Sequence, residues 1–291
     1  MASAAANSHE TCLACGAPLH AAMRLCPTCR ADAGAPNVRR CRTKENLEAL
    51  DARYEAARAR ASGMGCLKEF DVLKATIEQE SGVVVSMPAG AARQLFEDPE
   101  LLYDNYEHLV GAKARKPAAP DNDRHRCAVG ALLFGSYADE IVYGALSLGE
   151  EGLPTYGDVH CRLRSVTVEK RTSFLETNSF RFVKVRGITP GTPLPLGRTA
   201  CWEHRHRLVL AKLADSLSPG QTESDWQAIL LQSDGQSREN DDFVEAHIYD
   251  GFDKHAIESM VRASGKKLGR EAEMDIEIAM SRFNSFVGRK A

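Results

Sequence analysis

The sequence has no long apolar segment and no sign of a targeting peptide. No uninterrupted apolar run approaches the roughly 18 residues that a membrane-spanning helix needs. The opening segment, MASAAANSHE, lacks a basic stretch followed by an apolar one, so no secretory signal of the usual kind is expected. We therefore expect no membrane association and a cytoplasmic location, or secretion without a signal peptide into a host cytosol.

A large excess of charge and the common nucleotide-binding motifs are also missing. The chain has 37 basic and 40 acidic residues, which leaves a net charge of −3. That balance creates no general attraction for nucleic acid, so a nucleic-acid partner is not expected. The sequence contains no GxGxxG fingerprint, no GxxxxGK[ST] loop and no GxSxG turn. These absences argue against a Rossmann dinucleotide site, a P-loop and a serine-hydrolase elbow.

The cysteines indicate a metal site rather than disulfides. There are nine, and an odd number without a secretory signal argues against a disulfide framework. Four of them form two Cys-x-x-Cys pairs, namely Cys12, Cys15, Cys26 and Cys29. Four thiolates complete the coordination of zinc, so we predict a structural Zn²⁺ that supplies most of the folding energy of this segment. A redox dithiol and chance spacing are the alternatives.

The chain divides into three predicted parts, which together indicate an α+β fold. Residues 1–42 form the zinc module and a basic linker, 43–123 a helical region, and 124–291 a strand-rich domain. Periodicity predicts helices at 43–62, 66–80, 125–135, 203–215, 253–264 and 270–285, and a helical stretch at 89–111 that is interrupted around Asp98-Pro99. It predicts strands at 83–86, 141–148, 156–163, 166–168, 180–185 and 242–249. The stretch 111–124 is expected to be a loop or a boundary.

A set of short motifs lies in the strand-rich part. They are Tyr143 to Leu146 (YGAL), Tyr156-Gly157, Leu163-Arg164, Arg171 to Phe174 (RTSF), Ser179 and Glu245-Ala246. As a set they resemble an uncharacterised bacterial domain family allied to the ADP-ribosyltransferases. More distantly they resemble the bacterial effectors that ADP-ribosylate ubiquitin on threonine. Asn178 and His247 depart from the pattern, which usually has Asp and Gln there.

The resemblance implies an ADP-ribosyltransferase-like split β-sheet domain that binds NAD, with Glu245 as the catalytic residue. Transfer of ADP-ribose breaks the bond between nicotinamide and ribose through an oxocarbenium-like transition state, which a carboxylate can stabilise. In the run FVEAHIY, Phe243, Glu245 and His247 share one face of a strand, and the apolar alternates share the other. Glu245 is then expected to face a cleft. A glutamate on a solvated edge strand is the alternative.

Cationic and hydroxyl side chains are the candidates for binding NAD. The predicted residues are Tyr143, His160, Arg162, Arg164, Arg171, Thr172, Ser173, Ser179 and His247. The basic ones suit the phosphates, although an exposed basic strand face is the alternative for each arginine. The resemblance implies that the Ser/Thr motif positions the nicotinamide ribose.

These features predict a mono-ADP-ribosyltransferase that acts as a monomer and uses NAD to modify a protein side chain. Arginine-modifying transferases usually carry Glu or Gln two residues before the catalytic Glu, where this chain has Phe243. A phenyl ring cannot orient a guanidinium, so we expect a hydroxyl acceptor, with host ubiquitin as a candidate and an exported bacterial effector or toxin as the context. One alternative is an NAD glycohydrolase. Another is a non-catalytic protein whose zinc module and basic linker (Arg39, Arg40, Arg42 and Lys44) bind nucleic acid or protein.

Overall fold

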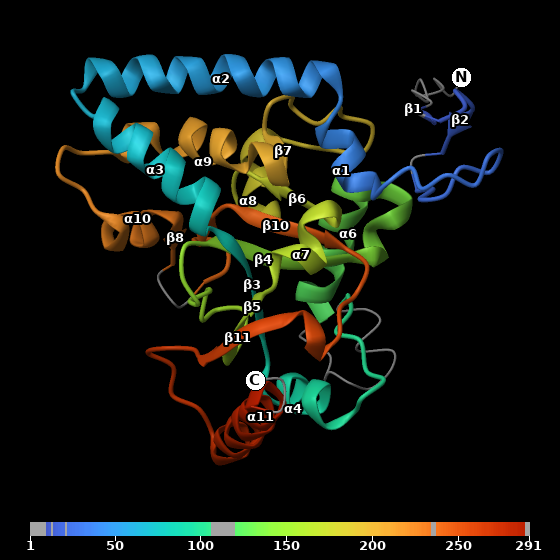
Figure 1. Ribbon diagram of the computed structural model, residues 1–291, viewed down its shortest axis with the longest axis vertical. Helices are drawn as coiled ribbons and strands as arrows, with labels where there is room; N and C mark the ends of the chain where they lie inside the picture. Colours follow the sequence, from blue (N-terminus) through green and yellow to red (C-terminus); the bar gives the residue numbers. More distant parts are fainter. Residues whose placement is uncertain (1–9, 13, 21, 106–119, 234–236, 289–291) are drawn as a thin grey trace.

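The structure is a computed structural model that describes residues 10–12, 14–20, 22–105, 120–233 and 237–288. A small N-terminal lobe holds the hairpin of β1 (Glu10–Thr11) and β2 (Pro18–Leu19). It lies beside a larger body in which helices surround a sheet (Figure 1). The prediction of a mixed helical and strand-containing chain is thus confirmed.

One seven-stranded sheet organises the body, in the order β11-β5-β3-β4-β10-β6-β7. All its neighbouring pairs are antiparallel. The strands are β3 (Gly82–Met87), β4 (Ile141–Ser147), β5 (Val159–Leu163), β6 (Thr172–Leu175), β7 (Thr199–Cys201), β10 (Glu245–Tyr249) and β11 (Ile257–Arg262). A separate pair joins β8 (Leu231–Gln232) to β9 (Asp242–Phe243).

Two sets of helices contribute to two apolar clusters. The larger cluster takes side chains from α2 (Lys44–Gly63), α3 (Leu67–Glu80), α4 (Ala89–Glu97), α9 (Arg205–Leu213), α10 (Glu223–Leu230) and α11 (Arg270–Gly288). The smaller takes them from α1 (Pro36–Cys41), α6 (Pro120–Phe134) and α8 (Ser179–Arg186). Short turns complete the fold: η1 (Gly135–Glu140), α7 (Ser165–Val168), η2 (Glu169–Arg171), η3 (Trp202–His204), η4 (Ala214–Ser216) and η5 (Lys254–Ala256).

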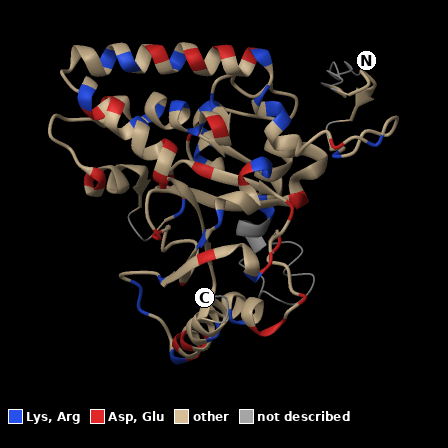
Figure 2. Cartoon of the chain, viewed as in Figure 1, with Lys and Arg blue, Asp and Glu red and all other residues tan. Residues whose placement is uncertain are grey.

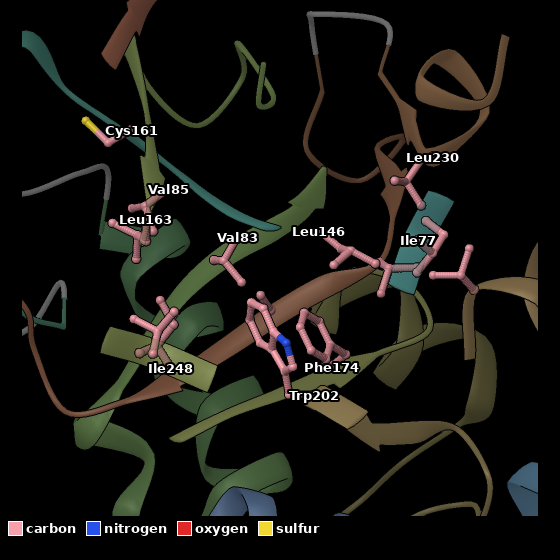
Figure 3. Packing of buried hydrophobic residues seen from close by; sticks show 14 of the residues in the cluster. Ile77, Val83, Val85, Leu146, Cys161, Leu163, Phe174, Trp202, Leu230 and Ile248 are labelled. Atoms are coloured by element: carbon pink, nitrogen blue, oxygen red, sulfur yellow. The ribbon is translucent and has the colours of Figure 1, made fainter. Parts of the chain in front are cut away.

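Alternation along the central strand β10 separates the two faces of the sheet. Val244, just before the strand, and Ala246 and Ile248 are fully buried in the larger cluster, which confirms the predicted apolar face. Figure 3 shows part of this packing, in which the rings of Phe174 and Trp202 lie side by side with centroids 5.7 Å apart. Burial of one such large side chain stabilises the fold by roughly 1.5–3 kcal/mol. Glu245 and His247, which alternate with these residues along the strand, therefore lie on the opposite face of the sheet.

Strand β3 ties the N-terminal part of the chain into the sheet. It pairs with β4 only over Gly82–Val84, and with β5 over Val84–Met87. Beyond Val84 the ladder between β3 and β4 therefore ends within the described residues, and the sheet opens between these strands. Because β3 comes from the range 43–123 and both its neighbours come from 124–291, these two predicted parts share one sheet and one core.

Several predicted elements are confirmed with small shifts at their ends. These are the helices at 43–62, 66–80 and 270–285 and the strands at 83–86 and 141–148. Of the helical stretch predicted at 89–111, α4 is observed, and it ends at Glu97, beside the predicted interruption at Asp98-Pro99. Residues 106–119 lie outside the described residues. Most of the predicted loop at 111–124 falls there as well, and its last residues already belong to α6.

Two predicted strands are wrong, and for the first of them a helix cap gives the reason. The segment 180–185 alternates like a strand but lies in α8. Asn178 caps this helix by accepting a hydrogen bond of 2.8 Å from the backbone N–H of Arg181. Gly187 ends it with φ of 59°. The segment 166–168 lies in the short helix α7.

The helix predicted at 253–264 is also wrong, and the reason is a β-bulge. Residues 257–262 form the edge strand β11, and its register on β5 shifts between Ile257 and Ser259. The bulge lets both Ile257 and Met260 point into the core. A spacing of three residues between buried positions imitates the period of a helix.

Charges of both signs are mixed over the surface. Lys and Arg alternate with Asp and Glu along α2, as Figure 2 shows. Among the described helices, none has the length and apolar character that crossing a bilayer would require.

Gly157 is expected to tolerate no side chain. A Cβ atom there would lie 2.3 Å from the backbone nitrogen of Met87 and 2.6 Å from its carbonyl oxygen. Since the clash is with backbone in a sheet, we expect Gly157→Ala to destabilise the fold by about 3 kcal/mol. Thermal unfolding measures this, with Gly149→Ala as the control because its Cβ would meet no atom within 4 Å. Equal melting temperatures for the two variants would contradict the prediction.

Candidate functional site

The four cysteines of the N-terminal lobe converge on one point. Their sulfur atoms all lie within 4.8 Å of one another. The Sγ atoms of Cys12 and Cys29 are 3.7 Å apart, and those of Cys15 and Cys26 are 3.6 Å apart. Zn–S bonds of about 2.3 Å place tetrahedral ligands about 3.8 Å apart. The predicted ligands are therefore brought together in a cluster that could hold a metal ion such as zinc.

Both Cys-x-x-Cys pairs form the same turn. The backbone N–H of Gly16 donates to the carbonyl of Cys12 at 2.8 Å, and that of Arg30 donates to the carbonyl of Cys26 at 2.9 Å. Gly16 and Arg30 both have positive φ, 70° and 63°. The backbone N–H of Cys29 is the main cause that lowers the pKa of Cys26 to about 6, which favours a thiolate that could bind a metal ion.

The main cavity of the body lies where β3 and β4 separate. Its volume of about 530 Å³ falls in the range of small-molecule sites, roughly 300–1,000 Å³. Val84 and Ser86 of β3 and Tyr143 and Ala145 of β4 line one part of it. Residues from α6, from the start of α8 and from the segments before β5 and β9 line the rest.

Glu245 lies at this cavity with its carboxylate anchored on one side. The residue is 5% exposed. Its Oε2 accepts hydrogen bonds from the Ser179 backbone N–H at 2.9 Å, from the Ser179 hydroxyl and from His247 Nε2 at 2.9 Å. Among the described residues, none donates a hydrogen bond to Oε1. The prediction that Glu245 faces a cleft with His247 beside it agrees with this geometry.

The start of α8 explains why the anchor forms. Asn178 caps the helix, and its amide also donates to the carbonyl of Asp241 near the beginning of β9. The cap fixes Ser179 as the first helical residue, so its N–H points out of the helix toward Glu245. A carboxylate beside helical N–H groups is stabilised by hydrogen bonding and by the partial positive charge of the helix start.

Ser179, His247 and Glu245 do not form a hydrolase triad. In a triad the imidazole uses one nitrogen for the serine and the other for the carboxylate. Here the same atom, His247 Nε2, lies 3.3 Å from the Ser179 hydroxyl and 2.9 Å from Glu245 Oε2. Serine and histidine therefore act together as donors that hold the glutamate.

Aromatic rings fix His247 behind Glu245. The imidazole packs edge-on against Phe134 and Tyr143, with centroids 4.8 and 5.4 Å away. Tyr143 lines the main cavity, whereas His247 lies under it and lines a separate small void. The ring position of His247 therefore depends on its neighbours rather than on solvent.

A second aromatic group forms another wall of the cavity. Tyr156 packs edge-on against Phe243 with centroids 5.6 Å apart, and the guanidinium of Arg238 lies over the Tyr156 ring at 5.0 Å. Burial, and then the charge of Glu245, raise the pKa of Tyr156. The phenol therefore keeps its proton and stays a hydrogen-bond donor.

Two arginines line the cavity, Arg238 and Arg126 of α6. Sequence reasoning missed both, because neither belongs to a motif. Tyr156 could have been found, since it belongs to the Tyr-Gly pair of the family pattern. Of the predicted NAD-binding residues, the cavity lining includes Tyr143 and Ser179.

The predicted phosphate-binding residues of β5 lie outside this lining. His160 is buried, its Nδ1 lies 2.8 Å from the Ser86 hydroxyl, and burial lowers its pKa to about 4. It is therefore neutral at physiological pH. Arg162 donates to the carbonyls of Gly149 (2.7 Å) and Glu80. Arg164, just after the strand, is the N-cap residue of α7.

Arg171, Thr172 and Ser173 of the RTSF motif make structural hydrogen bonds and are not part of the cavity lining. Arg171 donates to the carbonyls of Tyr249 and Asp250, and burial lowers its pKa. The hydroxyl of Thr172 donates to the carbonyl of Val168 at 2.8 Å. Ser173 accepts a hydrogen bond from Asn37. These residues support the sheet beside Glu245.

Comparison with known protein families and with curated proteins returns no match for this chain.

We expect the purified protein to contain one zinc ion per chain, because four converging thiolates saturate a tetrahedral site. Cys29→Ser should lose the metal and expose the lobe to proteolysis, as measured by metal analysis and limited digestion. Cys66→Ser is the control, since that buried thiol contacts the carbonyls of Met64 and Leu217 in the body. Retention of zinc by Cys29→Ser at the level of the control would contradict the assignment.

Proposed function

We propose that this protein is a mono-ADP-ribosyltransferase in which Glu245 stabilises the reacting ribose of NAD. The observation that carries the proposal is the asymmetry of the Glu245 carboxylate. Oε2 is anchored by Ser179 and His247, while Oε1 receives no hydrogen bond from the described residues at a cavity of about 530 Å³. Such a carboxylate is fixed in place and retains one oxygen for a ligand.

The chemistry needs a fixed negative charge. The bond between the ribose C1′ and the nicotinamide nitrogen breaks, nicotinamide leaves with the electron pair, and the ribose gains oxocarbenium character. Glu245 Oε1 is suited to accept a hydrogen bond from a ribose hydroxyl and to stabilise that charge. An acceptor oxygen then bonds to C1′, and its proton passes to water. Because Oε2 is already oriented, little reorganisation is needed during the reaction.

Arg126 and Arg238 are the residues we assign to the phosphates of NAD. Both line the same cavity as Glu245, whereas the basic residues of β5 lie outside it. Arginine suits a pyrophosphate because its guanidinium donates paired hydrogen bonds and stays charged. The Tyr156 ring beneath Arg238 keeps that guanidinium close to the cavity.

A hydroxyl is the acceptor class that we favour. Phe243 lines the cavity two residues before Glu245 and packs against Tyr156. It offers no hydrogen bond to a guanidinium acceptor. An NAD glycohydrolase, with water as acceptor, would use the same residues, and ubiquitin is the protein acceptor to test first.

The binding-protein alternative is weakened by the contacts of the basic linker. Arg39 donates to the carbonyls of Met23 and Gly34, and Arg40 donates to that of Leu133. Arg42 pairs with Glu203. These contacts occupy guanidinium donors that phosphate binding would need, and Glu203 offsets the charge of Arg42.

Glu245→Gln is expected to reduce NAD turnover by about 10²–10³-fold, because the amide keeps the shape of the side chain but loses the charge. Release of nicotinamide from NAD measures this, and a labelled NAD analogue shows whether protein is modified. Glu258→Gln, the same change at an exposed position of the edge strand β11, is the control. Turnover by Glu245→Gln equal to that of the control would refute the proposal, and nicotinamide release without labelled protein would indicate the glycohydrolase.

Arg238→Ala should raise KM for NAD more than it lowers kcat, because the assigned contact is with the phosphates and not with the reacting bond. An increase in KM of about tenfold corresponds to the loss of one charge-assisted hydrogen bond. Arg162→Ala is the control, since Arg162 lies outside the cavity and binds carbonyls. Steady-state kinetics with NAD give KM and kcat for both variants. A larger increase of KM in Arg162→Ala than in Arg238→Ala would exclude the assignment of Arg238 to the phosphates.

A further inference from the structure

We propose that Asn37 is a positioning residue for the Glu245–His247 pair and that the zinc-binding lobe holds Asn37 in place. As a statement about catalysis, this inference rests on the proposed function. The structural link between the cysteine cluster and β10 does not depend on that function. The link runs from the lobe to α1, from α1 to His247, and from His247 to Glu245.

Asn37 is buried at the seam between β6 and β10. Its side chain is 3% exposed, and its amide nitrogen lies 2.8 Å from the His247 carbonyl, 3.0 Å from the Ser173 hydroxyl and 3.2 Å from the Arg171 carbonyl. His247 and Ser173 are register partners in the sheet. One side chain from outside the sheet therefore fixes both strands at the level of His247.

The contact with His247 is transmitted to the candidate catalytic carboxylate. His247 Nε2 is one of the donors that hold Glu245 Oε2, at 2.9 Å. Asn37 binds the backbone carbonyl of the same residue, and the imidazole is confined by Phe134 and Tyr143. Loss of the Asn37 contact should therefore shift the imidazole relative to Glu245. Misplacement of a catalytic group by about 1 Å can cost on the order of 10²-fold in rate.

The position of α1 depends on its contacts because the helix has only six residues. A helix this short is not stable alone. On the side of the lobe, Arg39 of α1 donates to the carbonyls of Met23 at 2.8 Å and Gly34 at 2.6 Å. Arg24 of the lobe lies 3.5 Å from the carboxylate of Asp250, directly after β10. The lobe therefore contacts both the helix that carries Asn37 and the end of the strand that carries Glu245.

Asn46 provides a matched control. It is a second buried asparagine, 4% exposed, near the start of α2. Its amide donates to the carbonyls of Cys41 and Thr199, and its oxygen accepts from the N–H of Gly197. The Thr199 hydroxyl also donates to this oxygen, so removing Asn46 breaks at least as many hydrogen bonds as removing Asn37. None of these bonds of Asn46 reaches β6 or β10.

The test compares Asn37→Ala with Asn46→Ala in the full chain loaded with zinc. We expect Asn37→Ala to lower kcat for NAD turnover by about tenfold or more while KM changes by less than about twofold, since the phosphate contacts remain. Asn46→Ala should keep kcat within about twofold even if its melting temperature falls equally. Equal losses of kcat in the two variants would overturn the positioning role.

A second readout does not depend on NAD. The ring signals of His247 in the NMR spectrum, assigned with His247→Gln, should shift in Asn37→Ala and not in Asn46→Ala. Arg39→Ala removes the contact between the lobe and α1 without changing a cysteine, and it should shift the His247 signals in the same direction. Removal of zinc with a chelator should shift these signals in that direction as well. Unchanged His247 signals in Asn37→Ala, or after both Arg39→Ala and chelation, would overturn the link. If no variant and no wild type turns over NAD, the proposed function fails while this measurement still decides the inference.

Discussion

The hydrogen bonds that converge on Oε2 of Glu245 are the interaction on which the candidate site depends. A buried carboxylate is costly unless donors compensate for the water that it loses. Ser179 supplies two donors from the start of α8, and His247 supplies a third from the same strand as the glutamate. Each donor requires a larger element to be in place. The cap at Asn178 sets the start of α8, and aromatic packing sets the ring of His247.

The small N-terminal lobe gains a role from this arrangement. Its own apolar cluster is minimal, formed by Cys12, Leu19 and Cys26 with a few partly buried neighbours. Such a segment needs a metal or another cross-link to keep a fixed shape. A lobe with a fixed shape can serve as an anchor, and Asn37 follows it by a few residues and reaches the centre of the sheet. A metal bound in the lobe would in this way bear on the position of Glu245.

Periodicity and spacing predicted a large part of this structure. The CxxC pairs identified four cysteines whose sulfur atoms converge and could hold a metal ion, and the alternation in FVEAHIY identified both faces of β10. The failures have local causes. Capping by Asn178 turned an alternating segment into α8, and a bulge made β11 imitate a helix. The two arginines that line the cavity, Arg126 and Arg238, could not be predicted, because residues distant in sequence form the cavity with them.

The insertion of β3 between β5 and β4 also sets a limit on how the chain can be divided. A fragment that begins at residue 124 would contain all the motifs of the family pattern, yet it would lack the strand that supplies Val84 and Ser86 to the cavity. It would also leave the edges of β4 and β5 without a hydrogen-bonding partner. The shortest piece that can keep the pocket intact must therefore include residues 82–87, which precede every motif of the resemblance that begins at Tyr143.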